Sequence, residues 1–192
     1  MNIPNRLTIL RIILTFVFMF FLSRQGLWAK VLSLVIFIFA AVSDFLDGRI
    51  AQKNNMVTDF GKLMDPIADK ILVLSAFAVF VQMQLIKAWM FIIIISRELI
   101  ITSLRLFALN KGKVLSATKA GKHKTISQMF VIVAVLCFIV IKEAIKTYSI
   151  WNPNWEKIFC RSIFVLMLIT VVFTLYSGLS YLYENRHIIT KI

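Results

Sequence analysis

Residues 158–183, IFCRSIFVLMLITVVFTLYSGLSYLY, decide the fold class of this chain. Arg161 is the one charged residue in this stretch. A helix needs about 20 predominantly apolar residues to cross the hydrocarbon core of a bilayer, so the stretch is long enough to span a membrane. It also lacks the alternation of apolar and polar residues that is typical of barrel strands, which leaves a helix as the spanning structure.

Similar apolar runs precede this stretch, separated by short polar links that carry most of the charge. The runs cover Leu7–Leu22, Trp28–Val42, Leu63–Val81, Ala88–Leu109 and Ile126–Ile141, and the last one is Ile158–Tyr183. The chain of 192 residues is 60% hydrophobic, whereas soluble domains are about 45–50% apolar, so a soluble enzyme is excluded. We predict an all-α bundle of six transmembrane helices that forms one membrane domain over residues 1–192.

The chain is strongly basic, with 22 Lys and Arg against 9 Asp and Glu and a net charge of +13. Its 17 Phe residues exclude a disordered basic segment that binds nucleic acid, so we expect membrane lipid and no nucleic acid as a partner. Basic loops of membrane proteins favour the cytoplasmic side. Six spans put twelve Lys and Arg on the side of the N-terminus and seven on the other. This predicts a multi-pass protein of the cell membrane with cytoplasmic N- and C-termini.

All five Asp residues of the chain lie in one segment between the second and third runs, on the predicted cytoplasmic side. Residues 43–70 read SDFLDGRIAQKNNMVTDFGKLMDPIADK. On a helix, Asp44 and Asp47 share a face. Asp65 and Asp69 share a face of the next helix. If the two helix ends pack together, four carboxylates converge, and their mutual repulsion then requires a compensating positive charge.

Divalent cations are the positive charge that such ligands favour. Oxygen ligands without a nearby His or Cys indicate Mg or Mn over zinc or copper. Four carboxylates from two helices can hold two such ions, which is the usual apparatus for displacement at phosphorus. Gly48, Ala51 and Gly61 leave room for a flat group or a phosphate, although a lone glycine commonly serves helix packing in membranes. The alternative is that these Asp residues are ordinary surface charges of a solvated link. Acids near a membrane seldom have such a role.

The acidic segment resembles the signature of the CDP-alcohol phosphotransferase family, D-x-x-D-G-x-x-A-R-x8-G-x3-D-x3-D. The matching residues are Asp44, Asp47, Gly48, Ala51, Gly61, Asp65 and Asp69. Gln52 stands where the family has Arg. The resemblance implies six transmembrane helices, a homodimer, and transfer of the phosphatidyl group of CDP-diacylglycerol to an alcohol with release of CMP.

The resemblance also implies roles for individual residues. The metal ligands would be Asp44, Asp47, Asp65 and Asp69, holding two Mg or Mn ions in an active site that faces the cytoplasm. Asp69 would also be the catalytic base that takes the proton of the acceptor hydroxyl. Binding of CDP-diacylglycerol would involve Asn5, Thr8, Gly48, Ala51, Gln52, Thr58 and Gly61. Asn5 is equally suited to capping a helix. Gln52 brings no charge to the diphosphate, a task that Arg49 or Lys53 could take over.

The fourth apolar run contains charged residues that suggest a site for the acceptor. Arg97 and Arg105 are eight positions apart, which is about 80° around a helix, so both can line one cavity. In the link that follows, Lys122 and Lys124 belong to a cationic rim that suits an acceptor with its own phosphate. For these lysines, an ordinary cytoplasmic loop is the alternative.

Two stretches resemble the members of the family that use glycerol 3-phosphate. They are residues 60–70, FGKLMDPIADK, and residues 96–125, SRELIITSLRLFALNKGKVLSATKAGKHKT. The resemblance implies glycerol 3-phosphate as acceptor and phosphatidylglycerol phosphate as product, with the acceptor phosphate on some of Arg97, Arg105, Lys122 and Lys124. Transfer to inositol phosphate, serine or phosphatidylglycerol stays open within the family. A small cation or proton-coupled transporter is the alternative outside it, although a transporter spreads its acids across the bilayer.

Overall fold

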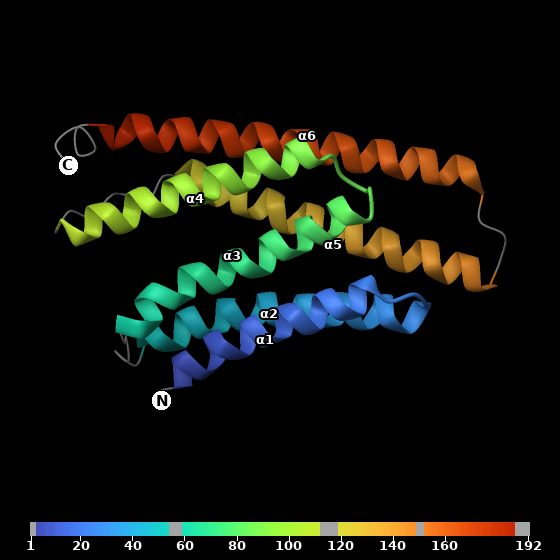
Figure 1. Cartoon of the computed structure of the whole chain (residues 1–192), viewed down its shortest axis with the longest axis horizontal. Helices are drawn as coiled ribbons and strands as arrows, with labels where there is room; N and C mark the ends of the chain where they lie inside the picture. Colours follow the sequence, from blue (N-terminus) through green and yellow to red (C-terminus); the bar gives the residue numbers. More distant parts are fainter. Residues whose placement is uncertain (1–2, 54–58, 112–118, 149–151, 187–192) are drawn as a thin grey trace. The chain divides into compact units, whose positions relative to one another are not determined.

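The computed structural model describes residues 3–53, 59–111, 119–148 and 152–186, which form six α-helices (Figure 1). Within these ranges the side chains of residues 3–7, 44–66, 69, 109, 110, 119, 120, 122 and 153 are not described. The helices are α1 Ile3–Ser23, α2 Leu27–Lys53, α3 Asp59–Gln82, α4 Ala88–Asn110, α5 Lys119–Tyr148 and α6 Pro153–Glu184. Each apolar run lies inside one helix, and the described ranges contain no strand, so the all-α prediction is confirmed for them.

The helices extend beyond the apolar runs into the polar links. Helix α2 continues to Lys53 and α3 begins at Asp59, so most of the acidic segment is helical. Helix α5 begins at Lys119. The interpretation of Lys122 and Lys124 as residues of a link is therefore wrong, since both lie in the first turns of α5. Lys is a good helix former, which allows a helix to begin before its apolar stretch.

Two helix boundaries follow directly from local chemistry. Gly26 lies between α1 and α2 with a φ of +100°, a conformation that side chains with a Cβ rarely adopt. At the start of α6, the Asn152 Oδ1 atom accepts a hydrogen bond from the backbone N–H of Asn154 at 2.9 Å. Pro153 then occupies the first helical position, where its missing N–H costs nothing. The Asn-Pro-Asn sequence therefore begins helix α6.

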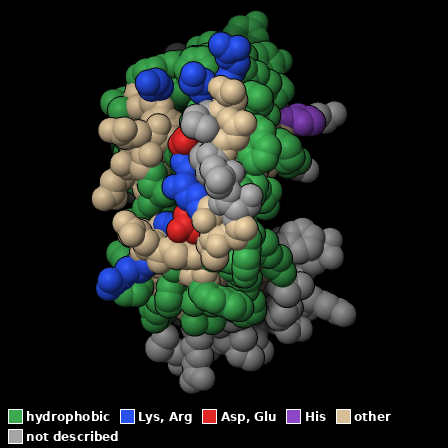
Figure 2. Space-filling view, turned by 90° about the vertical axis from the view of Figure 1, so that its right-hand side faces the viewer, with side chains coloured by type: hydrophobic (Ala, Val, Ile, Leu, Met, Phe, Trp, Pro, Cys, Tyr) green, Lys and Arg blue, Asp and Glu red, His purple; other side chains and the backbone are tan. Residues whose placement is uncertain are grey.

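The surface and the length of the helices are those of a membrane protein. His123–Tyr148 and Asn154–Glu184 are both long and apolar enough to cross a membrane. Shorter apolar stretches are Thr8–Ser23, Leu27–Ser43 and Lys70–Gln82. Large apolar side chains are exposed on several helices, and Figure 2 shows apolar side chains over much of the described surface in that view. Such a surface favours contact with lipid.

The chain divides into two compact units, each described by itself. Unit 1 comprises Met1–Phe80 and Val133–Trp155, and unit 2 comprises Val81–Ile132 and Glu156–Ile192. In unit 1, α1 packs against α2, with the rings of Phe18 and Phe37 5.4 Å apart. Helix α3 buries an apolar stripe that includes Leu72, Ala76, Phe77 and Phe80.

Unit 2 contains α4, the beginning of α5 and most of α6. Its buried apolar residues include Ile94 on α4, Ile132 on α5 and Met167 on α6. Ile101 and Ala108 of α4 form a buried cluster with Tyr181 of α6. Polar and charged side chains are buried in the same unit, and they form the site described next.

Candidate functional site

The structure places the four Asp residues of the signature on two helices. Asp44 and Asp47 lie in the second half of α2, and Asp65 and Asp69 lie in the first half of α3. Their side chains lie outside the described part of the structure, so the convergence of four carboxylates stays a prediction. Among the side chains that are described, none forms a group of three or more His, Cys, Asp or Glu that could hold a metal ion.

The residues predicted to bind CDP-diacylglycerol are described only in part. Thr8 on α1 is 2% exposed, so it is buried. The backbone is helical at the positions whose side chains are not described, which are Asn5, Gly48, Ala51, Gln52 and Gly61. Thr58 lies outside the described residues. Their roles therefore stay predictions.

A cluster of charged side chains joins α4 to α5 within unit 2. The Lys124 ammonium donates a hydrogen bond to the Glu98 Oε1 atom. The same Glu98 Oε1 atom lies 3.6 Å from the Arg97 Nη1 atom. Neighbouring residues of α4 thus supply a cation and a carboxylate, and α5 supplies a second cation. We call Arg97, Glu98 and Lys124 the cationic cluster.

The cationic cluster is buried and carries more positive than negative charge among the described side chains. Glu98 and Lys124 are each 5% exposed, and the side chain of Arg97 is 12% exposed. One carboxylate faces two cations. Buried charge is costly unless it is paired, and here Glu98 pairs with both Arg97 and Lys124. Arg and Lys together are the usual ligands of a phosphate group.

Helix α6 contributes a polar face to this part of unit 2. The Arg97 Nη2 atom donates a hydrogen bond to the Ser177 Oγ atom at 3.0 Å. Ser177 is one of a stripe of buried polar residues on α6, which are Thr170, Thr174, Ser177 and Tyr181, and buried Asn185 directly follows the end of the helix. At Gly178, an added Cβ would lie 3.2 Å from the Arg97 Cγ atom. The missing side chain of Gly178 therefore lets the stem of Arg97 pack closely against α6.

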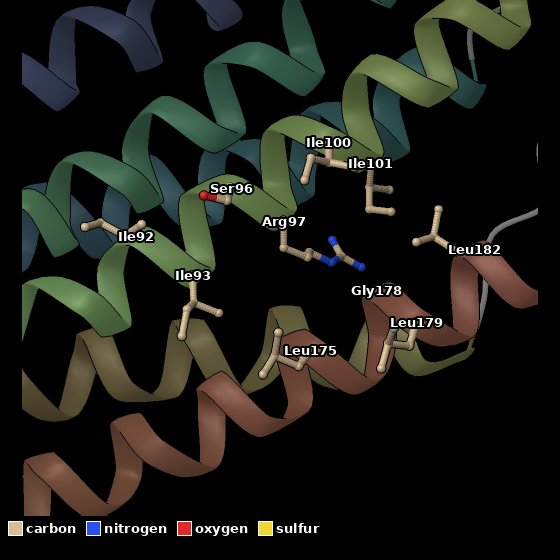
Figure 3. A pocket seen from close by; sticks show the side chains of 10 residues that line it. All are labelled: Ile92, Ile93, Ser96, Arg97, Ile100, Ile101, Leu175, Gly178, Leu179 and Leu182. Atoms are coloured by element: carbon tan, nitrogen blue, oxygen red, sulfur yellow. The ribbon is translucent and has the colours of Figure 1, made fainter.

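A groove of about 320 Å³ lies between α4 and α6, and Arg97 extends into it from α4 (Figure 3). Its lining residues are Ile92, Ile93, Ser96, Arg97, Ile100, Ile101, Leu175, Gly178, Leu179 and Leu182. Arg97 is the charged residue among them. The groove is otherwise almost entirely apolar, which suits the outer surface of a membrane helix pair.

The other predicted acceptor ligands are placed differently. Arg105 is exposed, and its guanidinium carbon lies 5.8 Å from the centroid of the Tyr181 ring, within the range of a cation–π contact. Arg105 does not line the groove that Arg97 lines. The side chain of Lys122 lies outside the described residues. Of the predicted set, the structure brings Arg97 and Lys124 together through Glu98, and Arg105 lies near enough to Arg97 for their charges to repel each other.

Sequence reasoning assigned no role to four residues that adjoin the cationic cluster or belong to it. They are Glu98, Gln128, Ser177 and Tyr181. The sequence spacing indicated Gln128, because this residue follows Lys124 by one helical turn. The polar stripe of α6 also recurs every three or four residues within an otherwise apolar run, which indicates one polar helix face.

Comparison with known sequences gives the class of this protein. Residues 1–176 match the family described as CDP-alcohol phosphatidyltransferase. The chain belongs to this family, and the resemblance of the acidic segment to the family signature is confirmed.

Several relatives of known name align with most of this chain. A protein of Bacillus subtilis (strain 168) is 35% identical over 196 aligned residues, covering 96% of this chain and 95% of the relative. One of Yersinia pestis (strain Pestoides F) is 34% identical, covering 95% and 93%. One of Cereibacter sphaeroides is 34% identical, covering 81% and 72%. All three are named CDP-diacylglycerol–glycerol-3-phosphate 3-phosphatidyltransferase.

Proposed function

We propose that this protein transfers the phosphatidyl group of CDP-diacylglycerol to glycerol 3-phosphate, with phosphatidylglycerol phosphate and CMP as products. Membership of the family and the printed name of the three relatives support phosphatidyl transfer. The buried cluster that brings Arg97 and Lys124 together supports the assignment of the acceptor, because Arg and Lys side chains commonly bind phosphate and glycerol 3-phosphate brings its own. Serine has no phosphate to place there.

In the proposed reaction, Asp69 takes the proton of the primary hydroxyl of glycerol 3-phosphate. The hydroxyl oxygen forms a bond to the phosphorus that carries the diacylglycerol, and the bond from that phosphorus to the oxygen of CMP breaks. Arg97 and Lys124 hold the phosphate of the acceptor, with Arg105 and Lys122 as further cations of the same site. The protein mainly positions two anions and neutralises their charge.

We assign Asp44, Asp47, Asp65 and Asp69 to two divalent cations, Mg or Mn. Their helical spacing supports this assignment. Asp44 and Asp47 continue, at the same spacing of four and three, the buried stripe of Ser33, Phe37 and Ala40 on α2. A set of carboxylate oxygens suits these hard cations. When bound, the ions supply positive charge that stabilises the oxygens at the reacting phosphorus.

Helix α3 repeats the same pattern in the opposite order. Asp65 and Asp69 precede buried Leu72, Ala76 and Val79 at a spacing of four and three. This register favours carboxylates on the inward faces of both helices. The proposed nucleotide site adjoins them, with Gly48, Ala51, Gln52, Thr58 and Gly61 near the acids and with Asn5 and Thr8 on α1.

The proposal includes the membrane arrangement. The six helices each span the cell membrane, both termini lie in the cytoplasm, and the acidic segment faces the cytoplasm. The apolar exposed surface supports contact with lipid, and the family supports a homodimer. Cross-linking of the full-length protein in vesicles tests the dimer, and labelling of cysteines introduced at each helix end tests the orientation.

Release of radiolabelled CMP from CDP-diacylglycerol is the deciding experiment. The full-length protein in detergent is given glycerol 3-phosphate, inositol phosphate, serine or phosphatidylglycerol, each with Mg, with Mn or with a chelator. We expect release with glycerol 3-phosphate and a metal. Release with another acceptor and none with glycerol 3-phosphate would contradict the proposal. CMP release in detergent, where there is no compartment to transport into, also separates an enzyme from a transporter.

The variant Asp69→Asn tests the assigned base. Loss of a general base slows a reaction by about 10²–10⁴-fold, so we expect CMP release to fall by that factor while the protein stays folded. Asp59→Asn is the matched control, because Asp59 begins the same helix but lies outside the signature. Normal turnover by Asp69→Asn would remove Asp69 from the mechanism without affecting the assignment of the substrates.

A further inference from the structure

Besides the Nε atom of Arg97, two buried polar groups of unit 2 have no hydrogen-bond partner among the described residues. They are the hydroxyl of Tyr181 on α6 and the side-chain Nε2 atom of Gln128 on α5. Each residue is 2% exposed, so bulk water does not satisfy either group. Buried donors in folded proteins nearly always have a partner, and a buried donor without one calls for an explanation.

The Gln128 amide lies next to the cationic cluster. Gln128 follows Lys124 by four positions in α5, so both side chains share one helix face. Lys124 on that face binds the carboxylate of Glu98. The described contacts of Gln128 leave its amide N–H groups available beside a buried positive charge.

Tyr181 lies near Arg97 of the same cluster. Tyr181 follows Ser177 by four positions in α6, and Ser177 accepts a hydrogen bond from Arg97. The Tyr181 ring lies beneath the guanidinium of Arg105, with 5.8 Å between the guanidinium carbon and the ring centroid. Contacts with Ile101 and Ala108 bury the ring. The hydroxyl is the part of this side chain for which the described fold provides no partner.

An oxygen-rich anion would satisfy both groups. Both can donate hydrogen bonds, and the neighbouring cluster contains the Arg97 and Lys124 cations. We propose that Tyr181 and Gln128 bind oxygen atoms of the acceptor, a polyol monophosphate, and so contribute to its selection. This inference rests on the proposed function. It adds two neutral contacts, from α5 and α6, to the cations already assigned.

The variant Tyr181→Phe removes the hydroxyl and keeps the ring. Loss of a hydrogen bond to the acceptor raises the KM for glycerol 3-phosphate by about five- to tenfold. The KM for CDP-diacylglycerol stays the same. The Tm stays the same or rises, because the hydroxyl has no described partner to lose. Tyr183→Phe is the matched control, because Tyr183 lies on the same helix and is exposed.

The variant Gln128→Met removes the amide and keeps the length of the side chain. It also raises the KM for glycerol 3-phosphate severalfold with an unchanged Tm. Gln82→Met at the exposed end of α3 is its control. A higher KM for glycerol 3-phosphate with an unchanged Tm indicates a role in acceptor binding. Loss of a purely structural residue would instead lower the Tm.

The outcomes separate this inference from the function on which it rests. If the wild-type protein transfers to glycerol 3-phosphate and both variants keep its KM, the inference is overturned and the proposed function stands. A lower Tm for both variants with an unchanged KM assigns the two groups to the fold and overturns the inference as well. If the wild-type protein does not use glycerol 3-phosphate, the proposed function fails, and this inference fails with it.

Discussion

Two buried lysines, one in each unit, have very different surroundings. Lys30, near the start of α2, donates a hydrogen bond to the carbonyl oxygen of Leu22 at 2.6 Å. Leu22 lies in the last turn of α1, where carbonyl groups have no partner within the helix and form the negative end of its dipole. Lys124, near the start of α5, instead pairs with Glu98, which also faces Arg97.

The difference shows that burial of a cation does not by itself identify a functional site. Around the turn between α1 and α2 the hydrogen-bond partners of Lys30 and Glu143 are backbone atoms, and the two opposite charges also attract each other. Glu143 there accepts a hydrogen bond from the backbone N–H of Gly26 at 3.2 Å, just as Lys30 binds a carbonyl. These contacts hold a turn together. In the cationic cluster the partners are side chains, and two cations share one carboxylate among the described residues. The combination of a buried Arg and a buried Lys side chain is what favours a phosphate-bearing ligand.

The largest expected effect is that of Glu98→Gln, which removes the carboxylate shared by the cluster. Breaking a buried ion pair by removing one partner costs about 3–5 kcal/mol, because the remaining charge is buried without compensation. We expect the free energy of unfolding to fall by this amount, measured by thermal unfolding in detergent. The double variant Glu98→Gln/Lys124→Met restores the charge of the wild-type cluster and should recover most of the loss. Wild-type stability of Glu98→Gln would refute the description of the cluster.

A smaller effect is expected for Lys30→Met in the other unit. The hydrogen bond from the ammonium to the Leu22 carbonyl is lost, which lowers the free energy of unfolding by about 1.5–3 kcal/mol. The KM for glycerol 3-phosphate should not change, because the partner of Lys30 is a backbone group of a turn. Thermal unfolding and CMP release measure the two quantities. Lys146→Met on α5 is the control, because Lys146 is exposed. An increase in KM with Lys30→Met would show that Lys30 also affects acceptor binding, as is proposed for Lys124.

The sequence predicted the helices well, because apolar runs long enough to span a bilayer leave the backbone few alternatives. The acidic segment was equally predictable from the sequence, because its Asp and Gly residues are close along the chain and form a long signature. The beginning of α5 at Lys119 was missed. The prediction followed the apolar residues, which begin at Ile126, and a polar first turn of a helix leaves no trace in hydropathy.

The cationic cluster was predictable only in part. Arg97 was recognised as a charged residue in an apolar run, whereas its partner Ser177 is 80 positions away and on another helix. Glu98 and Lys124 are 26 positions apart. Which carboxylate pairs with which lysine depends on how α4 and α5 pack. Local spacing cannot show such packing, although the polar stripe of α6 does appear in its spacing.

The smallest of these effects is expected for Lys124→Met, and it tests the site more directly than the fold. Without Lys124, the carboxylate of Glu98 still faces Arg97 at 3.6 Å, so the cluster becomes balanced and the Tm should change little. One of the two cations proposed to hold the acceptor phosphate is gone, and we expect the KM for glycerol 3-phosphate to rise about tenfold, equivalent to about 1.4 kcal/mol. CMP release at varied glycerol 3-phosphate measures it, with exposed Lys157→Met on α6 as control. A large fall in Tm with an unchanged KM would make Lys124 a structural residue like Lys30, because its ammonium would then stabilise the fold and not bind the acceptor.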